Sequence, residues 1–379
     1  MSAPDRRERL AWAYLAAVAE PPCPPLISLV GRYGAVETAR MIRTRTLPAG
    51  NAAAVTATQA RYETDSAATD LETAHRRGAR LVTPDDEEWP GWALLGLDQA
   101  STSVRGGAPL ALWVRGPGSL AEAASSAVGL VGSRAATAYG EHVSTRMASG
   151  LADRGVTVLS GGAFGIDGAA HRGALAAGGL TVAILACGID RDYPSGHARL
   201  LREIGEAGLV VSEYPPGTTA AKHRFLTRNR LVAALSAAVV VVEAGRRSGA
   251  TNTAAWARKL GRPLGAVPGP ITSAMSVGCH QMIADGQATL VMDADSILAL
   301  IQATGHDNFV RSAPSATDDL PTDEFEVIEA LPASGGLTVD EIAFSAGRPV
   351  TVVLAALARL EVKGLVDSDS GLWRLAGER

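Results

Sequence analysis

The chain has 379 residues, of which 47% are hydrophobic and 20% charged, and its formal net charge is −4. This length suits two or three domains with a sizeable core. The acidic balance excludes a chain that binds nucleic acid through uniform basicity, so a polyanion site must be a local patch. The three cysteines, Cys23, Cys187 and Cys279, have no C-x-x-C spacing and an odd count, which disfavours a zinc site or a disulfide framework.

This cysteine usage suits a reducing compartment, and we expect a cytoplasmic protein. The charged start, residues 1–9, precedes an apolar run that is too short to cross a bilayer and lacks a convincing signal-peptide cleavage pattern. We therefore expect no membrane partner.

The first 78 residues have helical periodicity. Apolar residues recur at helical spacing over residues 9–18, 26–33, 35–42 and 52–72, with breaks at three prolines and at Gly34. The pattern predicts a small all-helical module. Such helix pairs contact the DNA backbone in some proteins and serve docking or packing in others, and the sequence leaves both open.

Between residues 79 and 305, apolar runs of β type alternate with helical patterns. The runs are 127–131, 156–159, 181–186, 209–212, 238–243, 264–267 and 289–292. They lack period-two alternation, so we expect both faces of the sheet to be covered. The sequence predicts an α/β fold with a Rossmann-like, mostly parallel sheet and helices on both faces. Ligands of such sheets bind at the carboxyl ends of the strands.

A glycine-rich loop joins the second of these runs to a helical pattern, with the sequence SGGAFGIDGAAH over residues 160–171. A helix start exposes backbone N–H groups to an anion, and glycine lets the backbone approach closely. The loop matches neither G-x-G-x-x-G nor the P-loop pattern, so an anion site and tight strand–helix packing both remain open. The candidate anion ligands here are Gly161, Gly162, Phe164 and Gly165.

Two polar residues at the start of this helix have structural interpretations. We expect Asp167 to cap the helix, since a carboxylate beside a phosphate is repulsive. His171 lies one turn later, where it could hydrogen-bond Asp167; it is either a structural helix histidine with its hydrogen bonds satisfied or a ligand.

The basic residues gather in one stretch. Residues 219–262 hold nine Lys and Arg side chains and one acid, Glu243, which gives +8. The first part contains Lys222, Phe225, Arg228, Asn229 and Arg230. A ring among cations suits single-stranded nucleic acid, because cations neutralise phosphates and a ring stacks a base for about 1–3 kcal/mol. The alternative is a solvated basic face.

Two further strand ends carry polar residues. Ser133 and Arg134 follow one strand and precede a helix entry, which favours anion binding. Arg247, Ser248, Gly249 and Asn252 open another helix after a strand and suggest a second anion-receiving helix start.

These motifs together resemble the DprA (DNA-processing protein A, Smf) family. The matching segments are VGSR (131–134), SGGAFGIDGAAH (160–171), YP (193–194), SEYPPG (212–217), FLTRNR (225–230), EAGRRSG (243–249), GAVPG (265–269) and GCH (278–280). The resemblance covers residues 79–295. It implies a core that binds single-stranded DNA, homodimerisation, and loading of the RecA recombinase onto incoming DNA during natural transformation. The family often has SGSLIT where residues 248–253 read SGATNT, and commonly a proline in place of Leu226.

The candidate DNA-binding residues are Ser133, Arg134, Gly161, Gly162, Phe164, Gly165, Lys222, Phe225, Arg228, Asn229, Arg230, Arg247, Ser248, Gly249 and Asn252. We expect loop amides to take phosphates, the cations to compensate charge, and Phe225 to stack a base. No catalytic residue, metal site or cofactor is expected.

The tail reads as a linker over residues 306–323 and a winged-helix-like domain over 324–379. Helices are predicted at 324–331, 338–346 and 350–363, with a hairpin at 364–367 and 372–375. The recognition helix has only Arg359 and Lys363 as cations, which favours protein contact or regulation over duplex binding. The expected domains are thus a helical, SAM- or HhH-like domain (1–78), the core (79–305), the linker and this domain.

Two other functions remain open. A nucleotide-processing enzyme on the same fold would need a free acid, and only Glu213 and Glu243 lie near strand ends. Residues 268–270, Pro-Gly-Pro, stop short of the Pro-Gly-Gly-x-Gly-Thr-x-x-Glu run of nucleotide-processing relatives. A general recombination accessory protein would use the same site as a transformation protein. A dimer surface is not evident, although Met282 and Ile283 are candidates that core packing explains equally well.

Overall fold

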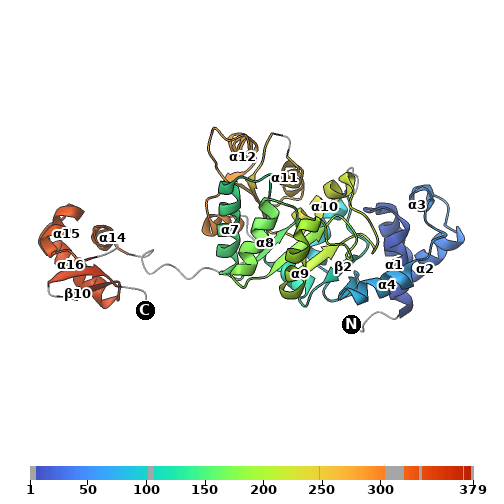
Figure 1. Cartoon of the computed structure of the whole chain (residues 1–379), viewed down its shortest axis with the longest axis horizontal. Helices are drawn as coiled ribbons and strands as arrows, with labels where there is room; N and C mark the ends of the chain where they lie inside the picture. The colour runs from blue at the N-terminus through green and yellow to red at the C-terminus, as the bar shows by residue number, and fades with distance from the viewer. Residues whose placement is uncertain are drawn as a thin grey trace. The chain divides into compact units, whose positions relative to one another are not determined.

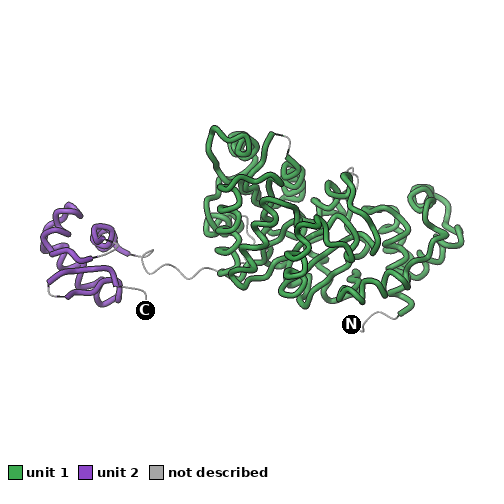
Figure 2. Tube along the Cα trace, viewed as in Figure 1, with its two compact units in different colours: residues 1–310 green, residues 311–379 purple. Residues whose placement is uncertain are grey.

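The computed structural model describes residues 6–100, 106–246, 248–303, 320–332, 335–369 and 371–376. The chain forms two compact units, residues 1–310 and 311–379 (Figure 2). No division between compact units falls at the predicted boundary after residue 78. Most of the predicted linker lies outside the described residues.

A nine-stranded sheet forms the centre of the first unit, in the order β1-β2-β6-β5-β4-β3-β7-β8-β9. Its strands are β1 (Ala79–Val82), β2 (Leu112–Arg115), β3 (Ala127–Gly132), β4 (Thr157–Ser160), β5 (Thr181–Leu185), β6 (Leu209–Ser212), β7 (Ala238–Glu243), β8 (Leu264–Ala266) and β9 (Thr289–Leu290). From β3 to β9 all pairings are parallel, whereas β2 pairs antiparallel with β1 and β6. The mostly parallel sheet is confirmed, and β1 and β2 were not predicted.

Helices cover both faces of the sheet (Figure 1). They are α5 (Gly91–Gln99), α6 (Leu120–Ser125), α7 (Ala138–Ala152), α8 (Ile166–Ala176), α9 (Ala198–Ala207), α10 (Lys222–Ala234), α11 (Ala250–Lys259), α12 (Val277–Ala284) and α13 (Ala294–Gln302). Successive residues of β7 join different cores: Val239 and Val241 pack in the cluster with α10 and α11, and Val240 and Val242 in the cluster with α7 and α13. This two-sided burial explains why the strands lack alternation.

The N-terminal helices α1 (Arg6–Val18), α2 (Pro24–Thr44), α3 (Ala52–Thr58) and α4 (Ala67–Arg76) lie together at one end of the first unit (Figure 1). The predicted helices 26–33 and 35–42 form one element that kinks at Gly34, where φ is 75°. The predicted helix 52–72 is wrong, because a turn around Arg61 and Tyr62 separates α3 from α4. Trp12 and Leu15 share a core with Trp113 of the sheet, so these helices pack directly against it.

The second unit is a winged helix, as predicted. It contains α14 (Thr322–Glu329), α15 (Val339–Ala346), α16 (Val350–Val362) and the hairpin β10 (Val366–Asp369) and β11 (Leu372–Leu375). Its own core includes Val327, Ile342, Leu357 and Val366. No single described helix is long and apolar enough to span a membrane. The pair α15 and α16, whose axes are bent by 106° relative to each other, would be long and apolar enough only if the two helices are taken together.

Arg230 belongs to the core, which corrects its prediction as a DNA contact. Its side chain is fully buried, and its guanidinium donates to both carboxylate oxygens of Glu213, at 2.6 and 2.8 Å. Nε donates to the carbonyl of Gly107 at 2.9 Å. These bonds tie α10 to the end of β6 and to the segment before β2, and the fully buried guanidinium is not accessible to a phosphate.

Truncating one partner of this buried pair leaves the other charged and unpaired. We expect Arg230→Ala to lower the free energy of unfolding by about 3–5 kcal/mol. Arg199→Ala is the matched control, since Arg199 is 87% exposed and pairs only with Glu203; its cost is below about 1 kcal/mol. Urea unfolding measures both, and equal costs would contradict a structural role for the buried pair.

His171 is a neutral histidine inside the core. Its Nδ1 lies 2.7 Å from Thr181 Oγ1, which itself donates to the carbonyl of Val158. Thr181 must therefore accept, so the proton is on Nδ1, and Nε2 is buried without a partner. Burial lowers the pKa of His171 to about 3. His171 is therefore a structural helix histidine, as one of the two interpretations held, but its hydrogen-bond partner is Thr181 and not Asp167, and it does not line the cavity at the strand ends.

This lowered pKa makes stability depend on pH. Between about pH 6.5 and pH 3 the unfolded chain binds a proton that the folded chain excludes, so stability is full above this range and falls with decreasing pH by about 1.4 kcal/mol per unit. We expect His171→Leu to remove this part of the slope and His142→Gln, on the exposed surface of α7, to keep it. Denaturant unfolding from pH 7 to pH 4 tests this, and identical slopes in all three proteins would refute it.

Candidate functional site

A cavity of about 690 Å³ opens at the carboxyl ends of β3, β4 and β7. Its lining comes from the β3–α7 loop, the glycine loop between β4 and α8, the first turns of α10, and the segment that opens α11. We call this cavity the groove. Nine predicted residues line it: Ser133, Arg134, Gly161, Lys222, Phe225, Arg228, Asn229, Ser248 and Gly249. The remaining lining includes Asp167, Tyr193, Ala221 and Met275.

A buried carboxylate binds the backbone of the glycine loop. Asp167 Oδ2 accepts hydrogen bonds from the amides of Gly161 and Ala163, at 3.1 and 3.3 Å. Asp167 was predicted to cap α8, but the capping position is Gly165 and no side chain caps it. Two amides of the loop, including that of the predicted ligand Gly161, are therefore already used inside the loop.

Positive φ angles and close packing make two loop positions specific for glycine. Gly162 and Gly165 have φ of 68° and 72°. A Cβ on Gly165 would lie 2.3 Å from the carbonyl oxygen of Ser133. This tight approach brings the glycine loop against the β3–α7 loop, so Ser133 and Arg134 stand beside it.

Arg228 forms the floor of the groove. It is 5% exposed, and its Nη1 donates to the carbonyls of Gly161, at 2.6 Å, and Ile184. Nε donates to Asn229 Oδ1 at 3.2 Å, while Nη2 donates to no acceptor within the described residues. Burial lowers the pKa of Arg228 and raises that of Asp167, and each charge opposes the other's shift. The two groups form an opposite-charge pair beneath the loop.

An exposed cation and two rings line the opposite wall. The guanidinium carbon of Arg134 lies 4.5 Å from the ring centre of Phe225. The Phe225 ring is 5.8 Å from that of Tyr193, which is 46% exposed. Arg134 thus covers part of the ring predicted to stack a base, and Tyr193 offers the more open ring.

Helix starts give the groove a positive character. The first turns of α10 and α11 contain no acidic residue, and the capping positions Ala221 and Gly249 supply no side-chain acceptor. Together with the start of α8, three helix N-termini border the groove, and each favours an anion. Lys222 is exposed in the first turn of α10.

Asn229 joins two of these helices. Its Nδ2 donates to the carbonyl of Gly249 and to Asn252 Oδ1, at 3.4 and 3.3 Å. Asn252 does not line the groove and acts on it only through Asn229. The predicted residue Arg247 lies outside the described residues.

Three loop residues also lie off the groove lining. Gly162 and Gly165 shape the backbone, and Phe164, 47% exposed, packs its ring 4.7 Å from that of His197. Sequence reasoning missed Tyr193 as a site residue. Its position beyond the carboxyl end of β5 was the available signal, because that sheet edge already carried the other candidates.

The two candidate catalytic acids, Glu213 and Glu243, are bound to structural partners. Glu243 accepts from the amide and the hydroxyl of Thr137, at 2.9 and 2.5 Å, and fixes the start of α7. Glu213 is bound by Arg230. No group of three or more His, Cys, Asp and Glu able to hold a metal is found in the described residues.

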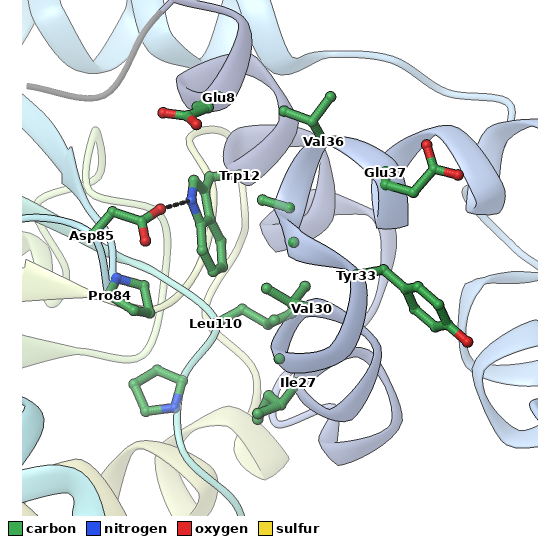
Figure 3. A pocket seen from close by; sticks show the side chains of 14 residues that line it. Glu8, Trp12, Ile27, Val30, Tyr33, Val36, Glu37, Pro84, Asp85 and Leu110 are labelled. Carbon is green, nitrogen blue, oxygen red and sulfur yellow. Dashed lines mark hydrogen bonds between the residues drawn. The ribbon is translucent and has the colours of Figure 1, made fainter.

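A second cavity of about 620 Å³ lies where α1 and α2 meet the loops around Asp85 and Leu110 (Figure 3). Its wall includes Trp12, whose Nε1 donates to Asp85 at 2.8 Å. The charged residues of the lining are Glu8, Glu37 and Asp85, all acidic, which makes it unsuitable for a phosphate.

Comparison with known families decides what this fold and groove belong to. The family described as DNA recombination-mediator protein A matches residues 80–302, and the DprA winged helix domain matches residues 311–371. The chain belongs to the DprA family. The DprA family acts in DNA processing during recombination.

Relatives of this DprA-family protein align with most of its length. The DNA processing protein DprA of Mycobacterium tuberculosis is 52% identical over 368 residues, covering 96% of this chain and 94% of the relative. Protein Smf of Escherichia coli is 37% identical over 298 residues, covering 77% and 76%.

Two solved structures are similar. DprA from Streptococcus pneumoniae has a TM-score of 0.63 at 28% identity and covers 82% of this chain and 100% of that one. DprA from Helicobacter pylori, described with a single-stranded DNA binding mode, has a TM-score of 0.51 at 27% identity and covers 60% and 96%.

The contact between Gly161 and Arg228 leaves no room for a side chain. A Cβ on Gly161 would lie 2.1 Å from Arg228 Nη1. We expect Gly161→Ala to displace the guanidinium and to cost about 1–3 kcal/mol of unfolding free energy. Gly249→Ala is the control, since its Cβ would meet nothing within 4 Å. Thermal or urea unfolding compares them, and an unaffected Gly161→Ala protein would show that the packing here is loose.

Proposed function

We propose that this DprA-family protein binds single-stranded DNA in the groove and serves as a recombination mediator. It protects incoming DNA and passes the strand to the RecA recombinase during natural transformation. The observation that carries the proposal is the combination in one cavity of Arg134, Lys222 and Arg228, three helix N-termini, and the rings of Phe225 and Tyr193.

The charge of the groove supports a polyanion as its ligand. Asp167 is the single acid among the lining residues, and its carboxylate is turned inward to the loop amides and Arg228. Two cations of the lining are exposed, Arg134 in the β3–α7 loop and Lys222 in the first turn of α10. A phosphate between them would contact both, while Nη2 of Arg228 supplies a donor from below.

The rings support an unpaired strand over a duplex. A base stacks on an aromatic face only when it is not held in a duplex, and such stacking is worth about 1–3 kcal/mol per base. Tyr193 and Phe225 lie side by side at the edge of the groove, at 5.8 Å between ring centres. Every base has a face to stack, so binding is expected to be nearly independent of sequence.

Family membership supports the partners. The matching family is described as a recombination mediator, and the H. pylori relative is described as binding single-stranded DNA. We propose a homodimer, which would place two grooves on one strand and raise avidity. Met282 is 6% exposed and packs in the core, and Ile283 is partly buried and packs against the same core, so neither residue marks the dimer surface.

A nucleotide-processing enzyme is the alternative, and the site gives it little support. It needs a carboxylate free to move a proton, and both Glu213 and Glu243 are engaged by structural partners. We therefore propose a binding protein without catalytic activity of its own.

The dependence of binding on salt tests the groove. For a single strand, the logarithm of the affinity changes by about 0.7 per log unit of salt for each phosphate neutralised. We expect Arg134→Ala and Lys222→Ala each to weaken binding and to reduce this slope by about 0.7. Fluorescence anisotropy with a labelled oligonucleotide, single- and double-stranded, at several salt concentrations measures both.

Arg199→Ala removes an exposed cation on α9, outside the groove lining, and is expected to leave the slope unchanged. A parallel assay of mononucleotide turnover addresses the enzymatic alternative. The proposal fails if Arg134→Ala and Lys222→Ala bind as the parent does, or if the protein ignores unpaired oligonucleotides at low salt yet turns over a mononucleotide.

A further inference from the structure

The winged helix exposes an apolar face that its own core does not use. Phe344, near the end of α15, is 92% exposed, and on α16 Val362 is 90%, Leu354 47% and Val350 39% exposed. Leu354 and Val362 share one side of the helix with Ala355 and Ala358, while Val353, Leu357 and Leu360 fill the core on the other. We call these exposed residues of α15 and α16 the apolar face.

An apolar helix surface of this kind ordinarily packs against something. A surface helix of a folded domain has one apolar stripe and one polar stripe. In α16 the exposed side from residue 350 to residue 358 contains no charged residue at all. Val350, Leu354 and Val362 recur at spacings of four and eight residues on one side of α16, and Phe344 lies near the end of the helix that precedes it. Exposed apolar side chains that gather on one side of a helix mark an interaction site.

The occupant is not DNA, because the charges around the face have the wrong sign. Residues 320–376 contain nine carboxylates and four basic side chains, a net charge of −5. The cations at the end of α16 are already paired: Arg359 with Asp323 and Glu324, and Lys363 with Glu324. A helix that enters a DNA groove needs free Lys or Arg for phosphates.

Carboxylates mark both ends of the apolar face. Asp340 lies one turn before Phe344 on the same side of α15, is exposed, and takes part in no ion pair among the described residues. Glu361 lies beside Val362 on the exposed side of α16, where it accepts a hydrogen bond from Ser368 at 3.2 Å. An apolar centre with acidic ends calls for a ligand with apolar anchors and cationic flanks.

We propose that this face docks a segment of a partner protein that carries apolar anchor residues flanked by Lys or Arg. Such a segment would bury Phe344 and Leu354 and would place its cations against Asp340 and Glu361. A second copy of this unit does not fit, because two faces that each belong to a domain of charge −5 repel each other. The partner is therefore a different, basic surface.

A peptide selection on the full chain tests the proposal. The probe is a random library of 16-residue peptides, selected against the immobilised protein in parallel with its Phe344→Glu and Leu354→Glu variants. Both positions are exposed, so the substitutions leave the core of the unit in place. Trp92→Glu is the matched control, since Trp92 is 88% exposed in the first unit.

We expect enriched peptides with apolar anchors and a net positive charge. The best of them should bind the parent and Trp92→Glu equally in fluorescence anisotropy, and at least tenfold more weakly to Phe344→Glu and Leu354→Glu. Asp340→Asn should also weaken binding of the best peptide relative to the parent protein, and this loss should be largest at low salt. The proposal is overturned if no enriched peptide depends on Phe344, if the dependent peptides are acidic, or if a 20-base-pair duplex binds through Phe344 instead. Unfolding curves of all variants confirm that the second unit is folded.

Discussion

The electrostatic balance between Asp167 and Arg228 beneath the glycine loop is the constraint on which the groove depends. Both side chains are buried, and burial shifts the pKa of each toward its neutral form while the partner's charge opposes that shift. Asp167 holds the loop through the amides of Gly161 and Ala163, and Arg228 holds it through the carbonyl of Gly161. Side chains beneath the loop therefore bind both backbone N–H donors and a backbone carbonyl acceptor of the loop.

This arrangement separates the cations of the basic stretch into different roles. Arg230 and Arg228 are two residues apart on α10, yet Arg230 is sealed in a core ion pair and Arg228 reaches the groove floor. Arg224 instead pairs with Glu20, in the segment between α1 and α2, at 2.6 Å. Sequence spacing gives the local charge, but only the packing of α10 against the sheet decides which side chain faces the ligand.

Much of the fold could be predicted from the sequence because the buried strands read as continuous apolar runs bounded by turns. β1 and β2, which pair antiparallel with each other at one edge of the sheet, were not predicted, although they are no shorter than the predicted β4 and β6. Nine of the predicted site residues line the groove together, because the strand ends of a parallel sheet converge. The hydrogen bonds and ion pairs around the groove were not predictable, because those of Asp167, Asn229 and Arg230 join residues that are close only after folding.

The hydrogen bonds within the glycine loop have a consequence for the kinetics of binding. The shape of this loop is fixed by bonds that exist before any ligand arrives, so the loop itself does not have to rearrange to receive a ligand or to release it. A single strand bound as proposed could then enter the groove along its length instead of being threaded by its end. Encounter would then be governed by diffusion and long-range attraction, and a bound strand could shift by one phosphate at a time without letting go.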